Sequence, residues 1–410
     1  MRTALANGDR PAGQRPPRFT VPSPSRREDL TPVGGPAPSR ATDGVLALIA
    51  LSAAVALLPW LGKATFPDEG VSLRSARMGW SALWQQSRVI DLVLLPYYSL
   101  LHLWIHFSDG IEWARLLSLL AFALTVFLVG HLGARLGGRV CGMLAATLAA
   151  TCPLLVTAAL SARPYALSAL AATVSIAALL RWLEDGRPGW LWWFCLAAVA
   201  TLLLQMFAVL APLSALAVII AFRPAEFRER WLALIVPIGL VPAAAFSLAV
   251  VAASQRSQIA WIPSLFEGRQ LVTALTGPAS GEHSLYAAVI LVVATAALAV
   301  CLRARNGAGF RFARRDFDLL ALLVAWAALP AVVLAVASLV KPVFVDRYVT
   351  SSAPGMAMAV ALLTARAFDL TAARWAERSH RMVGYVGLGA AVAAVWFVCT
   401  VPAARAIYHF

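Results

Sequence analysis

Two adjacent acids, Asp68 and Glu69, lie a few residues beyond the first long apolar run of the chain. A carboxylate at the edge of a membrane is costly unless water or a ligand solvates it. Such a group could act as a general base and take a proton from an acceptor hydroxyl. The alternative interpretation is a solvated pair of acids at a helix end. Asp68 and Glu69 are therefore candidate catalytic residues.

Three cations lie in two other short segments between apolar runs: Arg163 within 161–167, and Lys341 and Arg347 within 341–348. Arg163 precedes a helix whose N-terminus disfavours a cation, so it should have an anionic partner, either a carboxylate or a phosphate. Lys341 and Arg347 could likewise bind a lipid phosphate. The alternatives are an arginine that extends to the membrane surface and ordinary interfacial anchoring of the second segment.

Four further residues could contribute to a site. Asp91 opens an apolar segment, where it is either a helix N-cap or a second acid near the same cavity. His102 and His106 have a spacing that can hold a metal, but no third ligand is evident, so packing is favoured and no cofactor is expected. A divalent cation is possible but not indicated. Trp261 could stack on a sugar or anchor a loop at the membrane interface.

The composition defines the elements that must position these residues. Hydrophobic residues make up 60% of the 410 residues and charged residues 13%, against about 25% charged in soluble proteins. This predicts an all-α, polytopic transmembrane bundle of about 11 helices. The apolar runs are 44–62, 114–133, 140–160, 164–182, 190–205, 206–222, 231–253, 284–302, 318–340, 351–367 and 382–403. The long stretch 190–222 is divided near Gln205 because it exceeds one ordinary span. Residues 91–107 are polar enough to favour an interfacial or re-entrant position, and Val71 to Ser87 a short amphipathic helix.

The net charge of +14 could indicate either nucleic-acid binding or membrane orientation. About two thirds of the Lys and Arg residues fall in alternate segments, which are 1–43, 134–139, 181–189, 223–230, 303–317 and 366–381. Positive residues collect in cytoplasmic loops. The pattern therefore predicts a multi-pass inner-membrane protein with a cytoplasmic N-terminus and an outer C-terminus, and no nucleic-acid partner. The outer segments 63–113, 161–163, 254–283 and 341–350 then contain the candidate residues.

The first 43 residues are rich in Pro and Arg and poor in bulky apolar residues. This composition predicts a disordered cytoplasmic tail, followed by one transmembrane domain over 44–410. The five cysteines lie in apolar runs and match neither a disulfide framework nor a zinc site.

Several short motifs, in this order, resemble the GT-C superfamily of integral-membrane glycosyltransferases, and within it the bacterial family 39, protein-mannosyltransferase-like group. The resemblance covers most of residues 44–368. The motifs are Asp68-Glu69-Gly70, Asp91 with Pro96-Tyr97-Tyr98 and Leu101-His102-Leu103-Trp104, Arg115-Leu116-Leu117-Ser118, Ala162-Arg163-Pro164-Tyr165-Ala166-Leu167, and Pro342-Val343-Phe344 with Arg347-Tyr348.

The resemblance implies a GT-C-like bundle with juxtamembrane helices in a long first extracytoplasmic loop. It also implies inverting transfer of a mannose-like sugar from a polyprenyl-phosphate donor to an extracytoplasmic glycan, lipid or protein acceptor. Asp68 maps to the base, with Glu69 beside it, and Arg163, Arg347 and Lys341 are the expected ligands of the donor phosphate. The residues expected to line the substrate cavity are Asp91, Tyr97, Tyr98, His102, Tyr165, Trp261 and Tyr348. Membrane lipids are further expected partners.

Two other classes of protein remain open at this point. A transporter or flippase of polyprenyl lipids would have ionisable residues inside its spans and internal repeats, and the sequence shows no repeat. A non-catalytic membrane protein of cell-envelope assembly would not bring Asp68 and Arg347 together around one cavity.

Overall fold

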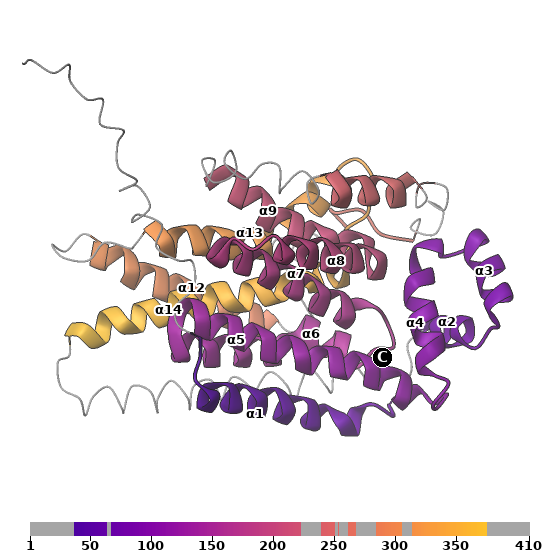
Figure 1. The fold of residues 1–410 in the computed structure, drawn as a ribbon, viewed down its shortest axis with the longest axis horizontal. Coiled ribbons are helices and arrows are strands. Elements are labelled where there is room, and N and C mark those ends of the chain that lie inside the picture. Colours follow the sequence, from indigo (N-terminus) through magenta and orange to yellow (C-terminus); the bar gives the residue numbers. More distant parts are fainter. Residues whose placement is uncertain are drawn as a thin grey trace, which may run out of the picture. The chain divides into compact units, whose positions relative to one another are not determined.

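The computed structural model describes residues 37–63, 67–222, 239–250, 253, 261–267, 284–305 and 314–374. These residues form helices and no strands, as predicted (Figure 1). The α-helices are α1 (Arg40–Leu57), α2 (Pro67–Ala76), α3 (Trp80–Val89), α4 (Leu95–Trp104), α5 (Ile111–Thr151), α6 (Pro153–Ala159), α7 (Tyr165–Asp185), α8 (Gly189–Leu204), α9 (Leu210–Phe222), α12 (Ser284–Arg305), α13 (Arg314–Ser338) and α14 (Ala353–Arg374). The 3-10 helices are η2 (Leu58–Trp60), η3 (Leu92–Leu94), η4 (Met206–Val209) and η7 (Asp346–Ser352).

The long helices agree with the predicted apolar runs, and the chain is an integral membrane protein. Five segments are long and apolar enough to cross a membrane: Arg40–Trp60, Ile111–Thr151, Tyr165–Asp185, Phe317–Ser338 and Asp346–Leu370. Shorter apolar helices match the other runs as far as 351–367. The run 382–403 lies outside the described residues, so the total of eleven spans stays a prediction. The break expected at Gln205 is confirmed, because this residue is extended between α8 and η4.

The first helix starts earlier than expected. It begins at Arg40, with the Ser39 hydroxyl accepting a hydrogen bond from Thr42 N, so the last residues of the predicted tail are helical. The predicted disorder of residues 1–36 lies outside the described residues.

Helix α5 is in fact two antiparallel helices joined at Gly138. This residue has φ 86° and ψ 176°, which interrupts the helix. A Cβ added to Gly130 would lie 2.9 Å from the Ala146 Cβ, and one added to Gly142 would lie 2.6 Å from the Ala134 Cβ. In a straight helix, residues 130 and 146 would be about 24 Å apart. The predicted loop at 134–139 therefore becomes a sharp turn, and glycines allow its two arms to approach closely.

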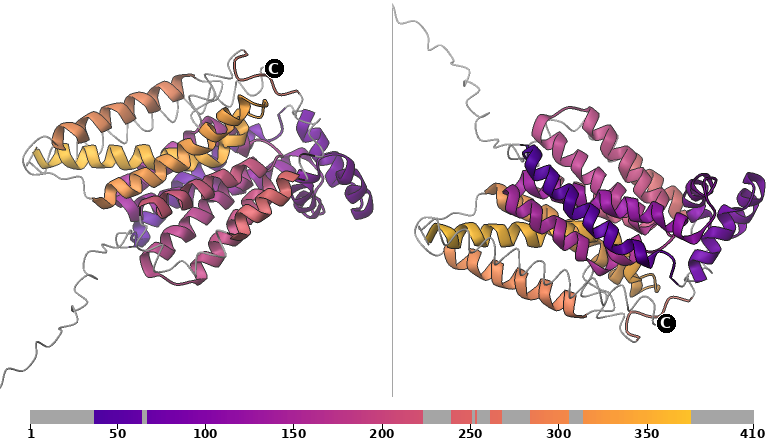
Figure 2. Two further views of the ribbon diagram at one scale, coloured as in Figure 1. Left: turned by 90° about the horizontal axis from the view of Figure 1, so that it is seen from above. Right: turned by 90° about the horizontal axis from the view of Figure 1, so that it is seen from below.

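The first long connection contains three short helices, α2, α3 and α4, which lie together at one end of the long helices (Figure 2). The prediction of one helix over 71–87 is wrong, because the chain breaks at Arg77–Gly79 and restarts as α3. Gly79 is extended, with φ −64° and ψ 156°, and forms the N-cap of α3. Helix α4 has 10 residues and is about 15 Å long, half the thickness of the hydrocarbon layer. It is too short to cross the membrane, in agreement with the interpretation of 91–107.

Packing of the long helices brings distant loops to the same end. Helix α1 packs along α5, α14 packs on α5 and α7 packs on α8. The 3-10 helix η7 is held by the Trp326 indole, which donates to Ser351 O at 2.8 Å, and by Ser351 Oγ, which donates to Ala208 O at 3.4 Å. Before η7, the Ser338 hydroxyl at the end of α13 accepts hydrogen bonds from Phe344 N and Val343 N. These contacts fix the segment that carries Arg347.

Candidate active site

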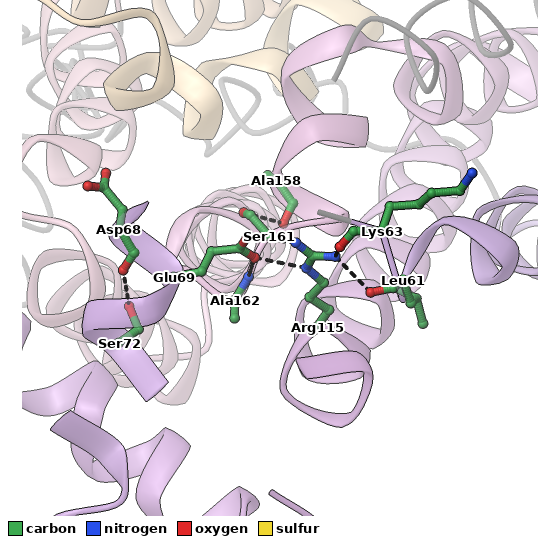
Figure 3. Close-up of polar contacts among 9 residues, drawn as sticks. All are labelled: Leu61, Lys63, Asp68, Glu69, Ser72, Arg115, Ala158, Ser161 and Ala162. Carbon is green, nitrogen blue, oxygen red and sulfur yellow. Dashed lines mark hydrogen bonds and ion pairs between the residues drawn. The ribbon is translucent and has the colours of Figure 1, made fainter. Parts of the chain in front are cut away.

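A buried ion pair joins Glu69 in α2 to Arg115 in α5 (Figure 3). Arg115 Nε and Nη2 donate to Glu69 Oε1 and Oε2 at 2.9 Å and 2.7 Å. Both side chains are 0% exposed. Arg115 Nη1 also donates to the carbonyls of Leu61 and Lys63 at 2.7 Å and 2.9 Å. Glu69 Oε1 accepts a third hydrogen bond from Ala162 N at 2.7 Å.

This ion pair and its hydrogen bonds join four segments: the end of the first span, the start of α2, the start of α5 and the turn before α7. Because Asp68 precedes Glu69 and Arg163 follows Ala162, the pair also fixes the backbones of both candidate functional residues. The Glu69 carboxylate is enclosed by its partners and is 0% exposed, whereas the Asp68 side chain is 45% exposed.

The role of Arg115 was not predicted, although its motif was recognised. One signal was available in the sequence: a charged residue at the start of an apolar run requires a partner. The identity of that partner could not be read from the sequence, because Glu69 is 46 residues away.

Asp68 lies between two guanidinium groups. Its Oδ2 is 3.2 Å from Arg347 Nη1, and the two side chains are 45% and 36% exposed. Arg163 Nη1 donates to the main-chain carbonyl of Asp68 at 3.3 Å and to Ser72 Oγ at 3.2 Å. In Figure 3 the Asp68 carboxylate points away from Glu69. The structure thus brings together the predicted acid and two of the three predicted cations.

Arg163 is partly buried and, among the described residues, forms no ion pair with a carboxylate. Its Nε is buried without a hydrogen-bond partner within this part of the chain. Burial opposes its charge, but the nearby Tyr165, Tyr98 and Asp68 outweigh this effect and raise the pKa of Arg163. The guanidinium therefore stays charged and retains donor capacity for an anion.

Aromatic side chains surround these charges. The Arg163 guanidinium lies 5.9 Å from the centroid of the Tyr165 ring. Tyr97 and Tyr98 are both 0% exposed, and burial raises the pKa of each phenol. The Tyr97 hydroxyl has no partner among the described residues. Both phenols of this tyrosine pair are therefore uncharged and shielded from water.

Asp91 is connected to the same group through Tyr98, whose hydroxyl donates to Asp91 Oδ2 at 3.2 Å. Asp91 occupies the N-cap position of η3, as predicted, but its side chain makes no capping hydrogen bond. Asp91 has φ 62° and is the one non-glycine residue with positive φ in the described ranges. Aspartate tolerates this left-handed conformation better than most residues. The strained backbone places the second acid next to Tyr98.

Two aromatic residues accompany Arg347. Its guanidinium lies 5.3 Å from the centroid of the Trp261 ring, which is 56% exposed. The Tyr348 ring lies 5.2 Å from that of Phe207. Trp261 thus contacts Arg347, which pairs with Asp68, and its role in a substrate cavity stays a prediction.

His102 and Lys341 are not brought into contact with this group by any described interaction. His102 Nδ1 is 2.7 Å from Ala76 O, and its ring packs edge-on against Trp80, so it joins α4 to α2 and α3. Lys341 is exposed after the end of α13, and no ion pair involves it in the described ranges. No group of three or more potential metal ligands occurs in these ranges.

Comparison with known proteins bears on the family and the fold of the chain. Residues 98–249 match the model of the dolichyl-phosphate-mannose-protein mannosyltransferase family. The fold is similar to that of ArnT from Cupriavidus metallidurans in the apo state, with a TM-score of 0.54 and 16% sequence identity. The similarity covers 86% of this chain and 64% of ArnT, so the chain spans less than two thirds of that protein. No curated protein sequence matches the chain. The family match and the fold together confirm the resemblance of this chain to the GT-C, family 39-like membrane glycosyltransferases.

Proposed function

We propose that this chain is a membrane glycosyltransferase that moves a mannose-like sugar from a polyprenyl-phosphate donor to an extracytoplasmic glycan, lipid or protein acceptor. The observation that carries the proposal is the group formed by Asp68, Arg163 and Arg347. A half-exposed carboxylate lies beside two guanidinium groups, and one of these forms no ion pair with a carboxylate in the described ranges. This combination suits a reaction that needs a base close to a phosphate.

In the proposed reaction, the Asp68 carboxylate accepts the proton of the acceptor hydroxyl. The hydroxyl oxygen attacks the anomeric carbon from the face opposite the phosphate, and this displacement inverts the configuration. The bond between the anomeric carbon and the phosphate oxygen breaks, and the electron pair stays on the polyprenyl phosphate. Arg163 and Arg347 stabilise the charge that develops on this leaving group.

The buried pair of Glu69 and Arg115 supports this chemistry without touching the substrate. It holds the chain at Asp68 and at Arg163, which keeps the base and the phosphate ligand at a fixed separation. Small displacements of reacting groups are costly in rate, so this rigidity is a requirement of the proposed reaction.

We further propose that the site faces the extracytoplasmic side. The Arg-rich segments lie at the opposite ends of α1, α5 and α7, where Asp43 contacts His131 and Arg135 contacts Glu184. Positive segments favour the cytoplasm, which leaves the site end outside.

The test is transfer from a labelled polyprenyl-phosphate sugar by membranes containing the Asp68→Asn variant. We expect the rate to fall by about 10²- to 10⁴-fold, the usual contribution of a general base. The matched control is Asp109→Asn, which alters another acid in the first long connection. Asp109 is 78% exposed and lies 3.7 Å from Arg77, so its loss should leave transfer unchanged. Full activity of Asp68→Asn would refute the base assignment.

A further inference from the structure

The ion pair between Asp68 and Arg347 joins two groups that the proposed function uses separately. Arg347 Nη1 lies 3.2 Å from Asp68 Oδ2. A carboxylate held by a guanidinium is a poorer proton acceptor, because the positive charge favours its ionised form. A guanidinium held by a carboxylate also has less capacity for a phosphate. As long as the two side chains are paired, Asp68 is therefore a weaker base and Arg347 a weaker ligand for phosphate.

The geometry of this ion pair allows it to break. The Asp68 and Arg347 side chains are 45% and 36% exposed, and solvent-exposed ion pairs contribute little to stability. The Nε of Arg347 is buried and has no hydrogen-bond partner among the described residues. The Trp261 ring, 5.3 Å from the guanidinium, supports Arg347 without using its donors. The neighbouring pair of Glu69 and Arg115 is the opposite case, since it is fully buried and bidentate.

The contacts of Arg163 do not depend on the ion pair between Asp68 and Arg347. It binds Asp68 through the main-chain carbonyl, not through the carboxylate, and it also contacts Ser72 Oγ. The Asp68 side chain can consequently turn without displacing Arg163. A phosphate bound by Arg163 would then lie next to Arg347.

We propose that the donor phosphate exchanges with Asp68 at Arg347, so that donor binding releases the base. This inference rests on the proposed function and adds the order in which donor binding and deprotonation of the acceptor occur. Before the donor binds, Asp68 is paired with Arg347. When the donor phosphate occupies Arg163 and Arg347, the Asp68 carboxylate is freed to face the acceptor hydroxyl. The donor therefore binds before the acceptor is deprotonated, and the base is inactive in a site without donor.

The test measures binding of a long-chain polyprenyl monophosphate to the full-length protein in detergent. The variants are Asp68→Asn, Arg347→Gln and the double variant. Asp68→Asn should bind the probe about two- to fivefold more tightly than the wild type, since the phosphate no longer displaces an exposed ion pair. In the Arg347→Gln background, the same Asp68→Asn change should give no gain. In the matched Arg163→Gln background the gain should persist, because Arg163 does not contact the Asp68 carboxylate.

The other possible results would overturn either the exchange at Arg347 or the proposed class of donor. A gain that persists without Arg347 would show simple repulsion between the carboxylate and the phosphate, and would overturn the exchange. Equal affinity of Asp68→Asn and the wild type would also overturn it. If the wild type binds the probe no better than a polyprenol without phosphate, the proposed donor class itself fails. Thermal unfolding of each variant in the same detergent verifies folding.

Discussion

Neighbouring acids in this chain should respond in opposite ways to the same chemical change. We predict that Glu69→Gln destabilises the folded protein, whereas Asp68→Asn leaves its stability nearly unchanged and slows transfer by about 10²- to 10⁴-fold. Each substitution replaces a carboxylate with an amide of almost the same shape. The difference in outcome therefore comes from the surroundings of the two side chains.

The contacts of Glu69 give the expected magnitude. Its carboxylate accepts hydrogen bonds from Arg115 Nε, Arg115 Nη2 and Ala162 N, at 2.9 Å, 2.7 Å and 2.7 Å. A glutamine retains one acceptor oxygen but removes the negative charge that faces the buried guanidinium of Arg115. Removal of one partner of a buried ion pair costs about 3–5 kcal/mol. The half-exposed pair of Asp68 and Arg347 contributes about 0–1 kcal/mol.

The assay is thermal unfolding of purified protein in detergent, together with transfer activity normalised to folded protein. Glu69→Gln should unfold at a clearly lower temperature than the wild type, and Asp68→Asn within a few degrees of it. Adding Arg115→Met to Glu69→Gln should recover part of the stability, because it removes the uncompensated charge. An unfolding temperature of Glu69→Gln equal to that of the wild type would refute the argument that this ion pair joins the four segments.

Two further predictions concern the turn in α5 and the orientation of the chain. Gly138→Ala should lower stability by about 1–3 kcal/mol, because φ 86° with ψ 176° is a backbone conformation that is essentially restricted to glycine. The control Gly44→Ala adds a methyl group to a helix with open space around it and should be neutral or stabilising, and equal unfolding temperatures for the two variants would contradict the strain argument. A cysteine at Arg139 should react with a membrane-impermeant thiol reagent only from the cytoplasm, and one at Asp109 only from outside. Labelling of Arg139→Cys in intact cells would contradict the proposed topology and indicate the opposite orientation.

The sequence by itself determined the membrane class and most of the helices. Apolar runs of about 20 residues define spans from composition alone, because the bilayer sets their length. The break at Gln205 followed from the same constraint, and the non-spanning character of 91–107 followed from its polar residues. The interruption at Arg77–Gly79 was missed, because the sequence pattern of a short amphipathic segment does not show where it breaks.

The candidate site was predictable as a set of residue types, since charged groups outside the Arg-rich segments are few and fall in the segments predicted to be outside. The roles of these groups were decided by the tertiary structure. Glu69 and Asp68 are neighbours with the same chemistry, yet one is enclosed by Arg115 and the other faces Arg347. Asp91 is oriented by Tyr98 instead of capping a helix, and His102 packs against Trp80. Burial and ion pairing depend on segments tens to hundreds of residues apart, so the sequence can indicate which residues are available, and only packing decides which of them remain free to react.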